Sequence, residues 1–511
     1  MIRFTEENGA LIARSRNETI RIEGWGNNAL RVRTTLLKKL PDDAHALTEN
    51  VAHSAKVTID EGSETAEIVN GKIKATVNGV GIICFYKDNE LILQEYYSYY
   101  YGSVRKEAIC YKIRSREYKG LASDDFKITV RFESDPKEKL FGMGQYQMPI
   151  LDLKGSVLPL EQRNSQVSVP FVVSSKGYGM LWNNPSTGEA AFGTNITKWI
   201  SDESDMVDYW ITADDTPAQI VTNYTECVGR APVMSRDYLG LWQCKLRYRT
   251  PDEVLEVARK YKELGIKLDV IVIDFFHWPH QGDWRFDEKY WSRDAVKAMT
   301  DELHAMGTKV MVSVWPSVDK RSENYYEMEQ KALISTTDVG SVQTYDYEGD
   351  CGTVDFFNPE AQEFVWSKCR QNYRDWGIDL FWLDNSEPDS TKYDFENYRY
   401  YTGRGSKVGC EYPKKYVEAF YNGQEAEGDH EAVNLCRSAW VGSQKYRTLV
   451  WTGDVQSNFE SFKDQVIAGQ NMGLAGIPWW TTDIGGFMTD NWDDPDFKEL
   501  LIRWYQYGVF C

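Results

Sequence analysis

The stretch IDLFWLDNSEP, residues 378–388, predicts a buried strand that ends in a polar turn. Its apolar residues form a run of strand length, and the carboxylate of Asp384 follows them directly. Pro388 closes the stretch and cannot continue a strand. We therefore expect Asp384 where a buried strand meets solvent, and we interpret the stretch as the floor of an active site.

Alternating helix and strand patterns surround this stretch. Residues 250–253, Thr-Pro-Asp-Glu, form a capping box with proline in the first helical turn, and an amphipathic helix follows to Leu264 before the strand 270–274. This unit then recurs along the chain. The strand candidates from residue 239 onward are 239–242, 270–274, 309–315, 378–384, 433–436, 448–451 and 477–480.

Seven such units predict a (β/α)8 barrel of the TIM type, because a doubly wound sheet would carry a phosphate-binding loop after its first strand. The chain ends at Cys511, where the eighth strand should begin, so we expect a barrel that is incomplete at its C-terminal end. Residues 1–235 show short alternating runs between turn residues, which predicts an N-terminal β-sandwich. We therefore expect a sandwich in 1–235 and a catalytic barrel in 236–511.

The net charge of −19 over 511 residues argues against a nucleic-acid partner or an anionic membrane, since phosphates would be repelled. The 18 Trp, 31 Tyr and 21 Phe suit a neutral ligand such as a sugar. No leader peptide and no membrane-spanning stretch are apparent, which predicts a cytoplasmic protein. The composition is compatible with a homo-oligomer.

Nine scattered cysteines without a Cys-x-x-Cys pair favour reduced thiols over a disulfide framework or a zinc site. His277 and His280 could suggest metal ligands, but Pro279 lies between them and no carboxylate and histidine cluster completes a site. Two ordinary loop histidines are the favoured interpretation. We expect neither a metal nor a cofactor.

Polar residues close the predicted strands, and in a barrel these positions carry function. They are Lys245, Arg247, Asp274, Trp315, Asp384, Arg437, Asp454 and Asp483. Glycoside hydrolysis needs two carboxylates, one as nucleophile and one as proton donor, and we choose Asp384 and Asp454. The alternative is structural: each aspartate could be a turn or helix cap, Arg437 could be a buried ion-pair partner, and the Trp residues could belong to the core.

Several motifs resemble those of glycoside hydrolase family 31, whose members are retaining α-glycosidases such as α-glucosidases and α-xylosidases. The resemblance runs along the whole chain. The motifs are LDLKG (151–155), SSKGYG (174–179), WNNPS (182–186), WQCKLRY (242–248) and WLDNSEP (382–388). The family's sugar-binding histidine after the eighth strand and its C-terminal sandwich domains have no counterpart in this sequence.

The resemblance implies that Asp384 is the nucleophile and Asp454 the acid/base of a double-displacement mechanism. It places Asp274, Arg437 and Asp483 in the sugar-binding pocket. We add Phe275, Phe276, Trp315, Trp382 and Trp451 as further expected substrate-binding residues. For this division of labour we expect a low pKa for Asp384, beside the cation of Arg437, a raised pKa for Asp454, and a bell-shaped pH profile.

Phe275 and Phe276 stand where α-glucosidases of the family typically have Ile-Asp. Two aromatic rings cannot hydrogen-bond a hydroxymethyl group and take up its space, which favours α-xylosides. The expected function is therefore an exo-acting retaining α-xylosidase. The alternatives are an α-glucosidase of the same family and a non-catalytic carbohydrate-binding relative or inactive fragment.

Overall fold

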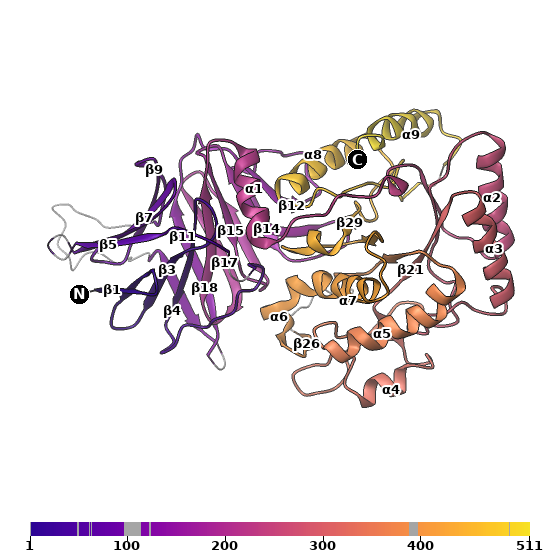
Figure 1. Ribbon diagram of the computed structural model, residues 1–511, viewed down its shortest axis with the longest axis horizontal. Coiled ribbons are helices and arrows are strands. Elements are labelled where there is room, and N and C mark those ends of the chain that lie inside the picture. The colour runs from indigo at the N-terminus through magenta and orange to yellow at the C-terminus, as the bar shows by residue number, and fades with distance from the viewer. Residues whose placement is uncertain are drawn as a thin grey trace. The chain divides into compact units, whose positions relative to one another are not determined.

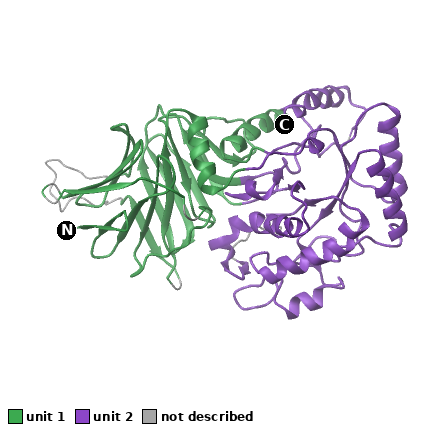
Figure 2. Cartoon of the chain, viewed as in Figure 1, with its two compact units in different colours: residues 1–161, 168–230, 460–478 green, residues 162–167, 231–459, 479–511 purple. Residues whose placement is uncertain are grey.

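The structure is a computed structural model that describes residues 2–48, 51–60, 62, 64–96, 114–121, 124–387, 397–489 and 491–511, so Pro388 lies outside the described residues. The chain divides into two compact units (Figure 2). The first comprises residues 1–161, 168–230 and 460–478, and the second comprises 162–167, 231–459 and 479–511. The short segment 162–167 therefore belongs to the second unit, although its neighbours in the sequence belong to the first.

The first unit is built from antiparallel sheets (Figure 1). An eight-stranded sheet contains β1 (Arg3–Glu7), β2 (Ala10–Arg14), β3 (Thr19–Gly24), β4 (Ala29–Thr35), β18 (Val207–Ala213), β15 (Tyr178–Trp182), β14 (Val167–Ser174) and β12 (Leu140–Gln145), in that order. Two five-stranded sheets contain β10 (Arg116–Gly120), β11 (Phe126–Glu133), β17 (Ile196–Ser204), β16 (Gly188–Phe192) and β13 (Val157–Leu160), and β5 (Lys56–Asp60), β6 (Thr65–Asn70), β7 (Ile73–Val77), β8 (Ile83–Lys87) and β9 (Glu90–Gln94). Helix α1 (Pro217–Val228) follows.

One hydrophobic core joins these sheets. It includes Ile22 of β3, Ile68 of β6 and Val130 of β11, all fully buried. In β3 buried and partly exposed residues alternate along the strand, which is the pattern of a sheet with one face on the core. The expected N-terminal β-sandwich is confirmed.

The second unit contains a parallel sheet whose strand order equals the chain order. The strands are β19 (Trp242–Lys245), β20 (Val270–Ile273), β21 (Lys309–Val314), β25 (Leu380–Leu383), β28 (Asn434–Cys436) and β29 (Thr448–Val450). A doubly wound sheet would reverse its order at a switch point, and this one does not. The expected barrel-type winding is confirmed.

Helices connect these strands. They are α2 (Pro251–Glu263), α3 (Arg293–Ala305), α5 (Pro359–Asn372), α7 (Tyr412–Ala426) and α9 (Pro495–Gly508), with the short α4 (Tyr325–Gln330) and α6 (Gly405–Val408). Helix α8 (Phe459–Leu474) follows β29 in the chain and belongs, apart from Phe459, to the first unit. Single 3-10 turns are η2 (Arg236–Tyr238), η3 (Arg374–Trp376), η5 (Gly409–Glu411) and η6 (Ser443–Tyr446). Helices α2 and α3 lie side by side (Figure 1). Small antiparallel pairings complete the unit: β22 (Ser317–Asp319), β24 (Asp350–Thr353) and β23 (Thr344–Asp346), and β26 (Arg399–Tyr400) with β27 (Gly403–Arg404).

The helix caps follow the sequence signals. Thr250 accepts a hydrogen bond from the Glu253 backbone N–H, and Asn358 accepts one from Glu360, each just before a proline at the first helical position. These caps mark where α2 and α5 begin. Because the six strands pair in parallel, their carboxyl ends lie at one edge of the sheet.

Two strand predictions differ from the structure by more than two residues, whereas the others agree to within two at each end. The first strand begins at Trp242 and not at residue 239, because Leu239 ends the 3-10 turn η2. Residues 477–480 form a single parallel bridge, between Val450 and Trp480, and not a strand. Pro478 has no N–H to donate to a ladder, which explains why pairing there is reduced to one bridge.

Two general features complete the description. No helix in the described part of the chain is both long and apolar enough to cross a bilayer. The eight described cysteines are free thiols, and Cys110 lies outside the described residues.

Candidate active site

Four carboxyl groups follow the carboxyl ends of the parallel strands. Asp274 comes directly after β20, Asp384 after β25, Asp454 shortly after β29, and Asp483 shortly after the bridge at Trp480. The charges of Asp384, Asp483 and Asp454 all act on Asp274, so the four groups are within electrostatic reach of one another. The four aspartates that were predicted from the sequence as strand-end site residues therefore lie close together in the structure.

Burial is the largest influence on the pKa of three of these groups, Asp274, Asp384 and Asp483. It raises the pKa of Asp384 to about 6; Arg437 opposes the rise and the charge of Asp454 adds to it. Burial, and then the charges of Asp454 and Asp384, raise the pKa of Asp483 to about 7. Burial also holds the pKa of Asp274 well above its ordinary value, against the N–H that Phe275 donates to it. Perturbed carboxyl groups in one cluster are typical of functional sites.

The expectation of a low pKa for Asp384 is wrong. Asp384 is 7% exposed, so desolvation disfavours the ionised form more strongly than one arginine favours it. The sequence shows that a cation is present, but it does not show how far Asp384 is removed from water, and that removal raises the pKa.

Arg437 is held by a second carboxylate. Its guanidinium donates to both Glu387 oxygens, at 2.8 and 3.0 Å, and to Asn385 Oδ1 at 2.9 Å. Its Nη1 lies 3.3 Å from Asp384 Oδ1. Glu387 is fully buried, and the bidentate pair fixes the plane of the guanidinium beside Asp384. Arg437 is therefore both an ion-pair partner, as the structural alternative held, and a cation at the site.

Asp454 is paired with a residue that the sequence analysis missed. Asn164 Nδ2 donates to Asp454 Oδ2 at 2.7 Å, and the backbone N–H of Asp454 donates to Asn164 Oδ1 at 3.1 Å. Asn164 lies in the segment 162–167, which belongs to the same compact unit. The two residues are 290 positions apart, and no local pattern marks such a contact in a single sequence.

An aromatic wall borders the site. Phe275 stacks on Trp315 with ring centroids 5.4 Å apart, and Trp315 stacks on Tyr347 at 5.5 Å. Phe276 packs against Phe275 at 4.2 Å, and the Arg247 guanidinium lies 4.6 Å from the centre of the Phe276 ring. Tyr347 was not predicted; the charges of Asp384 and Asp454 both act on it, which places it near them.

Two predicted tryptophans lie at the sheet interior. Trp382 and Trp451 make an edge-to-face contact at 5.3 Å, and both pack on a cluster of strand residues that includes Val272 and Met311. Trp315 Nε1 and Trp382 Nε1 are among the buried polar atoms that have no hydrogen-bond partner in the described part of the chain. Unsatisfied donors of this kind are costly unless a ligand accepts from them, and hydroxyl groups of a sugar can do so.

His277 is engaged by hydrogen bonds within the protein. Both ring nitrogens of His277 are engaged, at 2.9 Å with the Asp274 carbonyl oxygen and 2.9 Å with the Tyr373 hydroxyl. Burial lowers the pKa of His277 to about 4, so the ring is neutral at pH 7. Within the described ranges no cluster of three His, Cys, Asp or Glu side chains could hold a metal ion.

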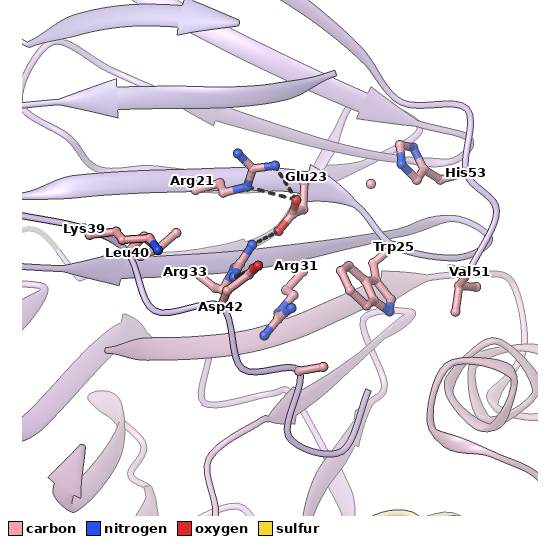
Figure 3. Close-up of a pocket in the computed structure, with 12 residues that line it drawn as sticks. Arg21, Glu23, Trp25, Arg31, Arg33, Lys39, Leu40, Asp42, Val51 and His53 are labelled. Carbon is pink, nitrogen blue, oxygen red and sulfur yellow. Dashed lines mark hydrogen bonds and ion pairs between the residues drawn. The ribbon is translucent and has the colours of Figure 1, made fainter. Parts of the chain in front are cut away.

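A separate cavity of about 560 Å³ lies in the first unit, on β3 and β4 (Figure 3). Figure 3 shows the Glu23 carboxylate between the guanidinium groups of Arg21 and Arg33, which lie 2.8 and 2.6 Å away. None of the site residues predicted from the sequence lines this cavity. The cavity is lined by an ion-pair cluster of the sandwich, and this cluster is distinct from the carboxyl cluster at the strand ends.

Comparison with known proteins gives matches along the whole chain. A model of the glycosyl hydrolases family 31 TIM-barrel domain matches residues 231–511, and one of the glycosyl hydrolase 31 N-terminal galactose mutarotase-like domain matches residues 19–190. The protein described as uncharacterized family 31 glucosidase ORF2 of Pseudescherichia vulneris is 47% identical over 520 residues, covering 100% of this chain and 98% of that protein. An α-xylosidase of Saccharolobus solfataricus is 33% identical over 409 residues, covering 76% of this chain and 53% of that protein.

A solved structure agrees with these matches. The crystal structure of a GH31 α-xylosidase from a soil metagenome, complexed with xylose, superimposes with a TM-score of 0.95 at 47% identity, covering 100% of this chain and 76% of that one. The match to the family's barrel domain, the full-length relative and the carboxyl cluster at the strand ends all support the same family assignment. The chain belongs to glycoside hydrolase family 31 and is an enzyme that cleaves glycosidic bonds.

Proposed function

We propose that this enzyme is a retaining, exo-acting α-xylosidase, with Asp384 as the nucleophile and Asp454 as the acid/base. The observation that carries the catalytic assignment is the pairing of two strand-end carboxylates with different partners. Asp384 faces a cation, Arg437, whereas Asp454 faces a neutral amide, Asn164. An anion beside a cation is suited to attack, and a carboxyl beside a neutral donor is suited to exchange a proton.

The proposed reaction has two steps. Asp384 attacks the anomeric carbon while protonated Asp454 gives its proton to the leaving oxygen, which forms a covalent glycosyl-enzyme. Water then attacks the same carbon while Asp454 removes its proton, and Asp384 leaves. Two inversions give net retention.

The choice of xylose rests on the aromatic wall. Phe275 and Phe276 offer no hydrogen bond to a hydroxymethyl group, and Trp315 backs Phe275 so that the ring cannot move away freely. The soil-metagenome α-xylosidase and the Saccharolobus solfataricus α-xylosidase, both similar to this chain, support the same substrate.

Chemical rescue tests the two carboxylates. Asp384→Ala should lose turnover by at least ~10³-fold, and added azide should then give the inverted β-glycosyl azide. Asp454→Ala with azide should give the retained α-glycosyl azide, because its nucleophile is intact. Nuclear magnetic resonance of the products distinguishes the two anomers. Unimpaired turnover in Asp384→Ala would refute the assignment.

An α-glucosidase is the second candidate, favoured by the description of the Pseudescherichia vulneris relative as a glucosidase. Comparing kcat/KM for aryl α-xyloside and aryl α-glucoside decides between the two. We expect the xyloside to be preferred by roughly 10- to 200-fold, the range for burying one group without partners. Phe276→Asp should reduce that preference, and aspartate tolerates the φ of +62° at this position. A preference for the glucoside in the unmodified enzyme would establish the second candidate.

A further inference from the structure

We propose that Asn164 is a positioning residue for the acid/base, and that it decides which oxygen of Asp454 carries the transferable proton. This inference rests on the proposed function, because it takes Asp454 as the proton donor. It assigns a role to the segment 162–167, which the catalytic scheme does not otherwise use.

The orientation of the Asn164 amide follows from its two contacts. The Asp454 backbone N–H can only donate, so the amide atom that receives it is the oxygen, Oδ1. The other amide atom is then the nitrogen, and it donates to Asp454 Oδ2 at 2.7 Å. A flipped amide would place two donors against each other and leave Oδ2 facing an acceptor.

This arrangement leaves one oxygen for chemistry. Oδ2 accepts the amide N–H, so the carboxylic proton resides on Oδ1. In the first step the Oδ1–H bond breaks, the new O–H bond forms on the leaving oxygen, and the C–O bond to the leaving group breaks as Asp384 bonds to carbon. Asp454 becomes an anion in that step, and a hydrogen bond to an anion is stronger than one to a neutral acid. Asn164 therefore stabilises the transition state more than the resting enzyme.

Asn164 is held in place by neighbours on both sides. Gln162 accepts from Ser438 Oγ at 3.0 Å and donates to the Cys410 carbonyl oxygen at 3.1 Å, which ties the segment to residues of the barrel unit. Gly453, which precedes the acid/base, has a φ of +70°. A Cβ at position 453 would lie 2.6 Å from Asn164 Oδ1 and 2.7 Å from the Ser165 backbone nitrogen. The absence of a side chain there lets Asn164 approach Asp454.

The dependence of rate on the leaving group tests this role. An α-glycosyl fluoride needs little protonation as it departs, whereas a methyl or sugar alcohol needs the acid fully. Asn164→Ala should keep activity on the α-xylosyl fluoride within about 3-fold and lose roughly 10- to 100-fold on a methyl α-xyloside, the effect of one hydrogen bond to a charged group. The fluoride is an internal control, since damage to folding or to Asp384 would lower both rates together.

Three further variants complete the test. Asp454→Ala should show the same leaving-group selectivity, more strongly, and Asn164→Ala added to it should cause no further loss, because Asn164 acts through that carboxylate. Asn195→Ala removes the same amide from an exposed bend between β16 and β17 and should change neither rate. A uniform loss in Asn164→Ala, no loss, or a further loss in the double variant overturns the proposal. If Asp454→Ala itself shows no leaving-group selectivity, the acid/base assignment fails instead.

Discussion

The ion-pair cluster on β3 and β4 and the carboxyl cluster at the barrel strand ends contain the same residue types. In the first cluster arginines and carboxylates are paired, whereas in the second the carboxyl groups outnumber the arginine. In the sandwich, Arg31 lies 2.7 Å from Asp208 with both side chains buried, and Glu23 bonds two arginines. At the barrel edge four aspartates gather, and Arg437 divides its charge between Glu387 and Asp384.

The titration of the carboxyls reflects this balance. Burial alone would raise the pKa of Glu23, but the hydrogen bonds and charges of Arg21 and Arg33 leave it below its ordinary value. Burial raises the pKa of Asp384 to about 6, because desolvation outweighs the one cation of Arg437 and neighbouring carboxylates add to the rise. Paired charges stabilise the fold, whereas an excess of buried carboxyl groups is typical of a site where protons are transferred and charge develops during catalysis.

The largest expected effect distinguishes two buried arginines, Arg31 and Arg437. Removing one partner of a buried ion pair costs about 3–5 kcal/mol, so Arg31→Met and Arg437→Met should both lower the free energy of unfolding in urea. Only Arg437→Met should also impair catalysis, because the cation that lowers the pKa of Asp384 is lost and the acid limb of kcat/KM moves above pH 6. A displaced acid limb in Arg31→Met would show that the two clusters are coupled.

The pH profile of the unmodified enzyme gives the next effect. Asp384 must be ionised to attack, and its pKa is about 6. We expect kcat/KM to fall about tenfold for each pH unit below 6, measured with an aryl α-xyloside. An acid limb near pH 4 would mean that Asp384 is effectively solvated when the substrate binds.

Asp483→Asn should stabilise the protein at neutral pH. The pKa of Asp483 is raised to about 7 in the folded state, so its folded form binds a proton more tightly than the unfolded form does. The contribution of Asp483 to stability is therefore fully present below pH 4 and is lost as pH rises toward and through 7. The amide removes this loss, and we expect a gain of about 1–2 kcal/mol at pH 7.5, reduced from the full shift because the side chain is partly exposed. The gain should vanish near pH 4 in urea titrations.

Glu23→Gln should give the smallest effect, with the opposite sign. The pKa of Glu23 is lowered, so its contribution is present above the ordinary value of 4.5 and is lost as pH falls below it. The amide should cost about 1 kcal/mol at pH 7 and less at pH 3, with kcat/KM unchanged. A stabilising Glu23→Gln would contradict the view that this cluster is matched for stability.

Much of the fold followed from local patterns. The apolar run before Asp384, the capping signal at Thr250 and the recurring helix and strand units predicted a barrel, and the resemblance to family 31 is confirmed by the matching domains. The strand at 477–480 was overestimated, because an apolar run says little about whether a proline leaves enough ladder hydrogen bonds.

The candidate site was predictable where it lies at strand ends. Asp274, Asp384 and Arg437 follow strands that their own neighbours specify, so position along the chain located them. Tyr347 and Asn164 lie on connections whose paths depend on long-range packing. The sequence pattern near each residue does not predict where such a connection runs. The catalytic roles stay predictions until the variants are measured.

The sequence by itself determined which carboxylates end the barrel strands, because strand periodicity and caps are encoded by residues near one another in the chain. Only the tertiary structure decided how those carboxylates titrate and which neighbours hold them. Burial raises the pKa of Asp384 although Arg437 is beside it, and Asn164 reaches Asp454 across 290 residues. Desolvation and long-range hydrogen bonds depend on what surrounds a group in space, and a linear pattern does not contain that information.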